Sequence, residues 1–328
     1  MSVPMSALLA LSLLLACGSH PTDSLRWREH WELLVIARDG SLVDANLSVS
    51  NTGLLRAQGH LRAARWSEGE APIRYGRDVA PIEVSVDPER QNMRLGWDGL
   101  RLGEDPMAPE TWTYRARDTE SSLLVHLRPE AGAAPLAVDT DERGAWRVEA
   151  TVPAGTVNGW VSSGPRGGLV EGWGVLLHRG GDGQPEGTRT TALVMGPELS
   201  IGLDHQGQTQ LSWARIEGQT LATGPASFER PRPAQLLLRF PDGPEVEIRL
   251  QGKVGGRTLL SEHLTLPEQR LLALVGAWQE RRTRRGWAKV RWQGRELVAS
   301  AMVVTESLTD WKGTEWKSQD EPLIETDP

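Results

Sequence analysis

The chain has 328 residues, of which 39% are hydrophobic and 24% are charged, and its formal net charge is −7. This composition is typical of a globular protein with one or two domains and is too polar for a polytopic membrane protein. The acidic balance predicts no nucleic-acid partner, because such proteins depend on a broad basic surface. A single cysteine and seven histidines without metal-ligand spacing predict no metal site and no cofactor.

The first 24 residues have the features of a lipoprotein signal. Ten apolar or small residues at 7–16 end at Cys17, a run too short to span a bilayer but suited to the hydrophobic region of a signal peptide. Leu14-Leu15-Ala16-Cys17 resembles the lipobox of bacterial lipoproteins, in which cleavage precedes a cysteine that carries a diacylglycerol. The resemblance implies a signal peptide at 1–16, lipidation of Cys17 with palmitate or a similar acyl chain, and a tether at 17–24.

The residue after Cys17 bears on where the anchored protein is sorted. Lipoproteins retained at the inner membrane typically have Asp there, and this chain has Gly18. We therefore expect a cell-envelope protein anchored to the outer membrane through its acyl chains, on the periplasmic side or on the surface. The membrane is then one partner, and other protein partners are not specified by the sequence.

Beyond residue 24 the prevailing pattern is period-two alternation bounded by turn residues, which is typical of antiparallel strands. The segments on either side of Asp39-Gly40 predict the first hairpin, because Asp-Gly suits a type I′ turn. Further hairpins are predicted at Trp97–Leu100, at Pro241–Gly243 and at Trp292–Arg295. We count about twenty strand candidates and one good helix candidate, Pro267–Gln279.

This many strands is too many for one open sheet and favours closed or paired sheets. The sequence predicts an all-β fold class, with two antiparallel lipocalin-like β-barrels in tandem and few helices. Changes in composition place the N-terminal barrel at 25–152 and the C-terminal barrel at 153–306. The segment 307–328 is rich in Asp and Glu and is predicted to be a disordered acidic tail. The run Arg281–Arg285 is predicted to be a solvated hairpin loop.

Three segments resemble the two-domain lipocalin-like superfamily of carotenoid hydratases, tocopherol cyclases and Svf1-like proteins. The segment at 29–33, Glu-His-Trp-Glu-Leu, is similar to the family's Glu-x-Trp start. The segment at 172–178 is similar to its Gly-rich strand ending in Asp-His, although Leu177 stands in place of the Asp. Gly286-Trp287-Ala288 and Met302–Glu306 resemble its closing hairpin. The resemblance implies two barrels that hold a hydrophobic ligand inside one barrel or between them.

Candidate catalytic residues are few. No Gly-x-Ser-x-Gly elbow or phosphate-binding loop is present in the sequence. His178 precedes a Gly-rich segment, and together with Glu171 it is a candidate for a general acid and base. The alternative is that the glycines at 180–183 simply form a hairpin loop.

Tryptophan dominates the aromatic residues, with 14 Trp against two Tyr and two Phe. An indole has a large apolar face and one N–H group, which suits the wall of a ligand cavity. The alternative is that tryptophan replaces Phe and Tyr as filler of the core. The candidates for ligand binding are the tryptophans within predicted strands: Trp31, Trp173, Trp213, Trp287 and Trp292.

Three functions remain open at this point. The first is a lipid-anchored envelope protein that binds or carries a hydrophobic small molecule, such as a lipid or an isoprenoid. The second is an isoprenoid hydratase, cyclase or isomerase built on the same fold. The third is a non-catalytic structural or interaction lipoprotein with filled barrels. The sequence favours the first.

We predict that Cys17→Ser abolishes acylation, because the cysteine sulfur is the atom that carries the lipid. Metabolic labelling with radioactive palmitate should label the parent chain and leave the variant unlabelled. The variant should also move from the membrane pellet to the supernatant, since stable anchoring needs acyl chains. Ser19→Ala is the matched control and should stay labelled. Palmitate incorporation into the Cys17→Ser chain would contradict the assignment.

Overall fold

The fold is described from a computed structural model. The described residues are 27–52, 55–79, 84–87, 92–95, 98–104, 106–139, 146–182, 187–259 and 278–309. The expected signal peptide, Cys17, the tether and residues 310–328 of the expected tail lie outside these ranges, as do residues 267–277 of the expected helix. In the described ranges the structure has 21 strands and no helix, so no helix there could cross a membrane. The predicted all-β fold class is confirmed.

The strands divide into two units at the connection between β12 and β13. Unit 1 holds twelve of them: β1 (Trp27–Ala37), β2 (Leu42–Thr52), β3 (Leu55–Trp66), β4 (Ile73–Val79), β5 (Val84–Asp87), β6 (Asn92–Leu95), β7 (Asp98–Leu102), β8 (Trp112–Arg117), β9 (Ser121–Pro129), β10 (Leu136–Asp139), β11 (Trp146–Ser163) and β12 (Arg166–Asp182).

Unit 2 holds nine strands. These are β13 (Arg189–Gly196), β14 (Leu199–Gln206), β15 (Thr209–Ile216), β16 (Gln219–Thr223), β17 (Ser227–Arg232), β18 (Gln235–Arg239), β19 (Glu245–Leu259), β20 (Trp278–Trp292) and β21 (Arg295–Thr309). Ser307–Thr309, predicted as the start of the tail, are therefore the last residues of a strand.

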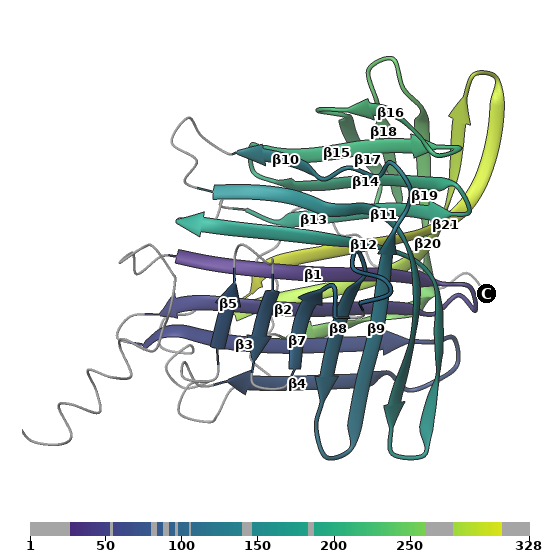
Figure 1. The fold of residues 1–328 in the computed structure, drawn as a ribbon. Helices are drawn as coiled ribbons and strands as arrows, with labels where there is room; N and C mark the ends of the chain where they lie inside the picture. Colours follow the sequence, from purple (N-terminus) through teal and green to yellow (C-terminus); the bar gives the residue numbers. More distant parts are fainter. Residues whose placement is uncertain are drawn as a thin grey trace, which may run out of the picture. The chain divides into compact units, whose positions relative to one another are not determined.

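Each unit is a single antiparallel sheet (Figure 1). The unit 1 sheet has the order β4-β3-β2-β1-β12-β11-β9-β8-β7-β6-β5, and β10 pairs with β11 beside this path. The unit 2 sheet has the order β16-β15-β14-β13-β21-β20-β19-β18-β17. In both sheets local hairpins are joined at the centre by one pairing between strands far apart in sequence, β1 with β12 and β13 with β21.

The pairing of β1 with β12 defines the extent of unit 1. All of β1 runs antiparallel to residues 172–182 of β12, from Trp27 opposite Asp182 to Ala37 opposite Gly172. The domain boundary expected at 152/153 falls within β11, which is continuous from Trp146 to Ser163 and pairs with β12. In the structure the two units separate after β12 instead, because β12 is hydrogen-bonded on both sides within unit 1.

The unit 1 sheet curls so that its two halves share one apolar interior. Strand β4 comes close to β9 and β11, and β3 comes close to β8. Tyr114 of β8 joins these halves, because its hydroxyl donates to the main-chain oxygens of Asn46 and Arg62, 3.2 and 3.1 Å away. Burial raises the pKa of Tyr114, so the hydroxyl remains a donor. The interior is therefore closed by a buried hydrogen bond as well as by apolar packing.

The predicted hairpins at Asp39-Gly40, Pro241–Gly243 and Trp292–Arg295 form. Gln293 and Gly294 both have positive φ angles, as the type I′ turn between β20 and β21 requires. At the first hairpin only Gly40 has a positive φ angle, so the type I′ turn expected at Asp39-Gly40 is wrong. The turn predicted at Trp97–Leu100 is wrong, because Asp98 and Gly99 already belong to β7 and Asp98 pairs with Leu95. The adjoining residues 96–97 lie outside the described ranges.

The segment Arg281–Arg285, predicted as a solvated loop, lies within β20. Its residues point alternately to the two faces of the sheet, and Arg281 is 4% exposed. The loop prediction is wrong because partners on β21 and β19 pair with every residue of the run.

Unit 2 curls around its own apolar core, which includes Ala192, Leu203, Ile248 and Val303. Side chains of β15 form hydrogen bonds to the segment that connects β16 to β17. Gln210 Nε2 donates to the main-chain oxygen of Ala226 over 2.6 Å, and Ser212 Oγ accepts from the Ala226 N–H over 3.1 Å. These bonds bring the two ends of the sheet toward each other.

A close contact between Trp213 and Gly202 stabilises the other face of this sheet. The two residues are direct partners across β14 and β15, and the indole Nε1 donates to Ser200 Oγ over 3.2 Å. A Cβ atom on Gly202 would lie only 2.1 Å from the Trp213 ring. A larger residue at 202 would have to displace a tryptophan that is 1% exposed.

We predict that Gly202→Ala lowers the free energy of unfolding by about 1–3 kcal/mol, the usual cost of overpacking. Gly196→Ala is the matched control on β13, because its added Cβ would meet nothing closer than 3.9 Å. Denaturant unfolding of both variants checks the prediction. Equal stability of the two variants would contradict the packing of Trp213 over Gly202.

Candidate functional site

A histidine–carboxylate pair lies between the central strands of unit 1. His178 Nε2 of β12 is 3.0 Å from Glu29 Oε1 of β1. Their side chains are 21% and 14% exposed, so the pair is partly open. An ionised carboxylate can only accept, so Nε2 carries the hydrogen and Nδ1 is left to accept or donate a proton. The geometry is that of an oriented acid–base group.

Trp31 forms the wall against which this histidine packs. It lies directly opposite His178 in the β1–β12 ladder, and the rings stack with centroids 3.9 Å apart and an interplanar angle of 12°. Its indole N–H donates to the same Glu29 oxygen over 3.3 Å. Glu29 and Trp31 are two residues apart on one strand, so both point to the same face of the sheet. The carboxylate is thus held by two donors.

Trp112 and Glu149 extend this cluster. Trp112 of β8 is 3% exposed, and its ring centroid is 5.6 Å from that of Trp31, at 37°. Glu149 of β11 is the main-chain partner of His178 on the side away from Trp31. Its carboxylate accepts from Thr151 Oγ1 over 3.1 Å and lies 3.4 Å from Arg147 Nε. The site therefore combines an imidazole, two carboxylates and two indoles.

The described residues contain no candidate site for a metal ion. Across the described residues, no three His, Cys, Asp or Glu side chains come together in a group that could hold one. An imidazole beside carboxylates is suited to proton transfer, and the two indoles are suited to binding apolar groups.

The structure does not bring the predicted pair His178 and Glu171 together. They are an odd number of positions apart on β12, so their side chains leave opposite faces of the sheet. Glu171 is exposed, and its main-chain oxygen accepts from the N–H of Arg38 over 2.7 Å. The partner of His178 is Glu29 instead. The glycines at 180 and 181, expected in a loop, are part of β12 and pair with β1.

The five tryptophans predicted to bind a ligand fall into different environments. Trp31 adjoins His178. Trp173 lies beneath the guanidinium of Arg38 at 5.7 Å, and Trp287 lies beneath that of Arg249 at 5.3 Å. Trp213 is packed over Gly202, and Trp292 is partly buried at the edge of the unit 2 core. Of the five, Trp31 is the one placed beside a group that can transfer protons.

The sequence did not assign Glu29, Trp112 or Glu149 to the site. Glu29 belongs to the segment quoted for its Glu-x-Trp resemblance, and the spacing of two already puts it on the face of Trp31. Trp112 was not among the five tryptophans predicted to bind a ligand. These residues come together because β1 pairs with β12. That pairing joins segments far apart in the sequence, and no local pattern predicts it.

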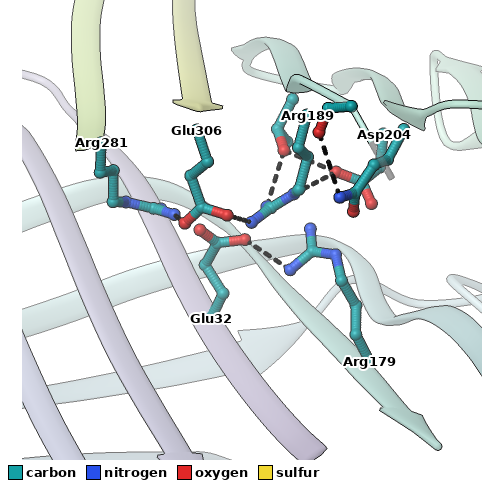
Figure 2. Close-up of polar contacts among 9 residues, drawn as sticks. Glu32, Arg179, Arg189, Asp204, Arg281 and Glu306 are labelled. Carbon is teal, nitrogen blue, oxygen red and sulfur yellow. Dashed lines mark hydrogen bonds and ion pairs between the residues drawn. The ribbon is translucent and has the colours of Figure 1, made fainter. Parts of the chain in front are cut away.

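Each unit also contains a buried ion pair (Figure 2). In unit 1, Arg179 Nη1 is 2.9 Å from Glu32 Oε2, with the side chains 3% and 0% exposed. Glu32 is next to Trp31 on β1, so it points to the face opposite the His178 site. This pair is closed to solvent, whereas the Glu29–His178 pair is partly open.

In unit 2, Arg189 lies between two carboxylates, as Figure 2 shows. Its Nε is 3.0 Å from Asp204 Oδ1, and its Nη1 is 2.7 Å from Glu306 Oε2. Arg281 bonds to the other oxygen of Glu306, and Thr191 bonds to both Arg189 and Asp204. Burial alone would lower the pKa of Arg189, but Glu306 and Asp204 raise it above its ordinary value. The two guanidiniums and two carboxylates balance in charge.

Comparison with solved structures establishes what the fold resembles. The chain is similar to kievitone hydratase from Nectria haematococca, with a TM-score of 0.54, 11% identity, and 87% of this chain and 90% of that chain covered. It is similar to CghA solved with Sch210972, with a TM-score of 0.60, 10% identity, and 88% and 89% covered. It is also similar to an AttH candidate from Nitrosomonas europaea, with a TM-score of 0.54, 12% identity, and 93% of this chain and 96% of that chain covered.

The likeness extends over both units and concerns the fold. No family model matches the chain, and no curated protein matches its sequence. The expected all-β fold of two lipocalin-like domains is confirmed, and each domain is a half-barrel formed by one curled antiparallel sheet. At these identities the fold does not assign an activity.

We predict that Arg189→Met lowers the free energy of unfolding by about 3–5 kcal/mol, because it leaves two buried carboxylates without their shared cation. The matched control is Arg239→Met, since Arg239 pairs with Glu229 at the surface and is 45% exposed. That control should cost less than about 1 kcal/mol. Denaturant unfolding at neutral pH measures both. An Arg189→Met protein as stable as the control would refute the structural role of the buried cluster.

Proposed function

We propose that the protein is a hydratase- or cyclase-type enzyme that acts on an isoprenoid or a similar hydrophobic alkene in unit 1. The observation that carries the proposal is the partly open Glu29–His178 pair stacked on Trp31. The likeness of the fold to kievitone hydratase supports it over the carrier function that the sequence favoured. His178 and Glu29 are the proposed catalytic residues, and Glu149 is a second carboxylate beside them.

The pair is suited to moving a proton between a carbon and a water molecule. In its doubly protonated form, His178 can deliver a proton from Nδ1 to one carbon of a C=C bond while Nε2–H stays bonded to Glu29. The neighbouring carbon then forms a bond to water oxygen, and the water proton returns to a base. The net change is addition of one H2O. If a second C=C bond attacks the cation instead of water, the product is a ring and the proton is lost from carbon.

The indoles of Trp31 and Trp112 are suited to the charge that develops during this reaction. An aromatic face attracts a cation by about 0.5–2 kcal/mol, and more where water is excluded. Both rings also provide apolar surface that a hydrocarbon substrate needs. Trp31 has a further role, because it orients the Glu29 carboxylate through its N–H.

A location at the cell envelope fits this substrate class. We propose that acyl chains on Cys17 hold the enzyme at a membrane, where hydrophobic alkenes are dissolved. The chain would then meet its substrate at the bilayer surface, and binding would not require the alkene to cross water.

We predict that His178→Ala and Glu29→Gln each lower product formation by at least about 100-fold, the range expected for loss of a general acid–base group. The full chain is incubated with a panel of acyclic isoprenoid alkenes in H2(18)O, and the products are analysed by chromatography and mass spectrometry. Incorporation of one labelled oxygen indicates hydration, and a new product of unchanged mass indicates cyclisation or isomerisation.

Glu171→Gln is the matched control, because Glu171 is a carboxylate on the same strand but on the opposite face. It should retain full activity. Activity that survives both His178→Ala and Glu29→Gln would refute the assignment. An isoprenoid that is bound and recovered unchanged would support the carrier function instead.

A further inference from the structure

Two hairpin turns lie side by side at one end of the strands of unit 2. The ladder between β19 and β20 ends where Glu245 is opposite Arg291. The turn that precedes β19 and the turn that follows β20 therefore leave the sheet next to each other. Between them is a groove that is open to solvent and has a volume of about 700 Å³, which is in the range of small-molecule sites. The groove thus has room for a ligand.

Both turns have a defined backbone conformation. In the first turn, the N–H of Gly243 donates to the main-chain oxygen of Phe240 over 3.1 Å, and Asp242 has a φ angle of 54°. In the second turn, Gln293 and Gly294 have φ angles of 50° and 76°. The hairpins therefore fix the positions from which the Asp242 and Gln293 side chains extend. A ligand that meets such a preformed surface has a smaller entropy cost of binding.

The charged side chains around the groove compensate one another. Arg291 Nη1 is 3.3 Å from Glu245 Oε1, and its Nε is 3.4 Å from Glu296 Oε2. Arg295 Nη1 is 2.6 Å from Glu217 Oε1, which belongs to the turn between β15 and β16. Each guanidinium and carboxylate has more hydrogen-bonding positions than these contacts use. The wall can therefore donate to hydroxyl groups and accept from them, while its ion pairs reduce its attraction for a charged ligand.

Three further side chains line the groove and have no polar partner in the part of the chain that the structure describes: Asp242, Trp292 and Gln293. Trp292 also packs against the apolar core of unit 2 and is partly buried. Its indole offers an apolar surface and one N–H donor at the groove wall. The Asp242 carboxylate adds acceptors, and the Gln293 amide adds donors and an acceptor. The groove thus combines one aromatic side chain with several available hydrogen-bonding groups.

We propose that this groove is a binding site for a neutral oligosaccharide. A sugar ring has C–H groups on its faces and hydroxyls at its rim, so it fits an apolar surface beside mixed donors and acceptors. Trp292 would contact a ring face, while Asp242, Gln293 and Arg291 would bond to hydroxyls. Because the groove is open, the rest of the chain can continue into solvent. An anionic sugar would be repelled by Asp242, and a cationic one by Arg291 and Arg295.

This site goes beyond the proposed reaction, because it is built from unit 2 alone and uses none of the residues around His178. Its test uses the full chain carrying Cys17→Ser, so that no acyl chain is attached. Cellotetraose, maltotetraose and the tetramer of N-acetylglucosamine are the neutral probes, and tetragalacturonate and the glucosamine tetramer are the charged comparisons. Calorimetric titration should show one site that binds a neutral tetramer at least about tenfold more tightly than either charged tetramer.

Variants locate the site. Trp292→Ala and Asp242→Gly should each weaken binding of the neutral tetramer by at least about tenfold. Glycine adopts the positive φ angle at position 242 without strain, so Asp242→Gly removes the carboxylate and keeps the turn. Trp160→Ala is the matched control, because Trp160 is 46% exposed on β11 of unit 1, and it should leave the affinity unchanged. If thermal melting shows that Trp292→Ala does not fold, Asp242→Gly still tests the proposal.

Four results would overturn the proposal. The first is no binding of any neutral tetramer at concentrations up to about 10 mM. The second is a charged tetramer that binds as tightly as the neutral ones. The third is unchanged affinity in a folded Asp242→Gly protein. The fourth is loss of binding in His178→Ala, which would place the sugar in unit 1. Retained binding in His178→Ala, even where that variant has no catalytic activity, supports a separate site.

Discussion

The pairing of β1 with β12 is the constraint on which the rest of unit 1 depends. It joins the first described strand to residues 172–182 and leaves both strands hydrogen-bonded on each side. Side chains alternate between faces, so a slip of one residue would turn Trp31 and His178 away from each other and expose the interior side chains. Stability and the geometry of the candidate site are therefore fixed by the same register.

The same ladder carries two carboxylate–cation contacts of opposite character. On one face, Glu29 forms a hydrogen bond with a partly exposed histidine, His178. On the other face, Glu32 meets Arg179, which is buried and keeps its proton. An arginine pair suits a permanent structural contact, whereas a histidine pair suits a group that must gain and lose a proton. One face of this strand pair thus carries a structural ion pair, and the other face carries the proposed acid–base pair.

Local patterns in the sequence were sufficient for much of the fold but not for the site. Alternation identified the all-β class, and Gln293-Gly294 identified a turn from residue preferences alone. The prediction for Arg281 was wrong because a run of arginines is typical of a solvated loop, whereas here the whole run pairs across the sheet and Arg281 and Thr283 are buried. His178 was singled out, yet its partner Glu29 was not, because the two are brought together by a pairing across most of unit 1. Trp31 and Trp213 look alike in sequence, and only their cross-strand partners, a histidine and a glycine, distinguish a site wall from core filler.

The two halves of the unit 2 sheet are joined at its centre by the pairing of the unit's first strand, β13, with its last, β21. During synthesis the amino-terminal strand of this unit must therefore wait until almost the whole unit has left the ribosome. Until then β13 and β20 each expose an unpaired edge, which is a template for association with other chains. The arrangement also makes the unit's folding depend on contacts between residues distant in sequence, which slows folding. A chain that ends before β21 would therefore fail to fold unit 2 as a whole, instead of only lacking one strand.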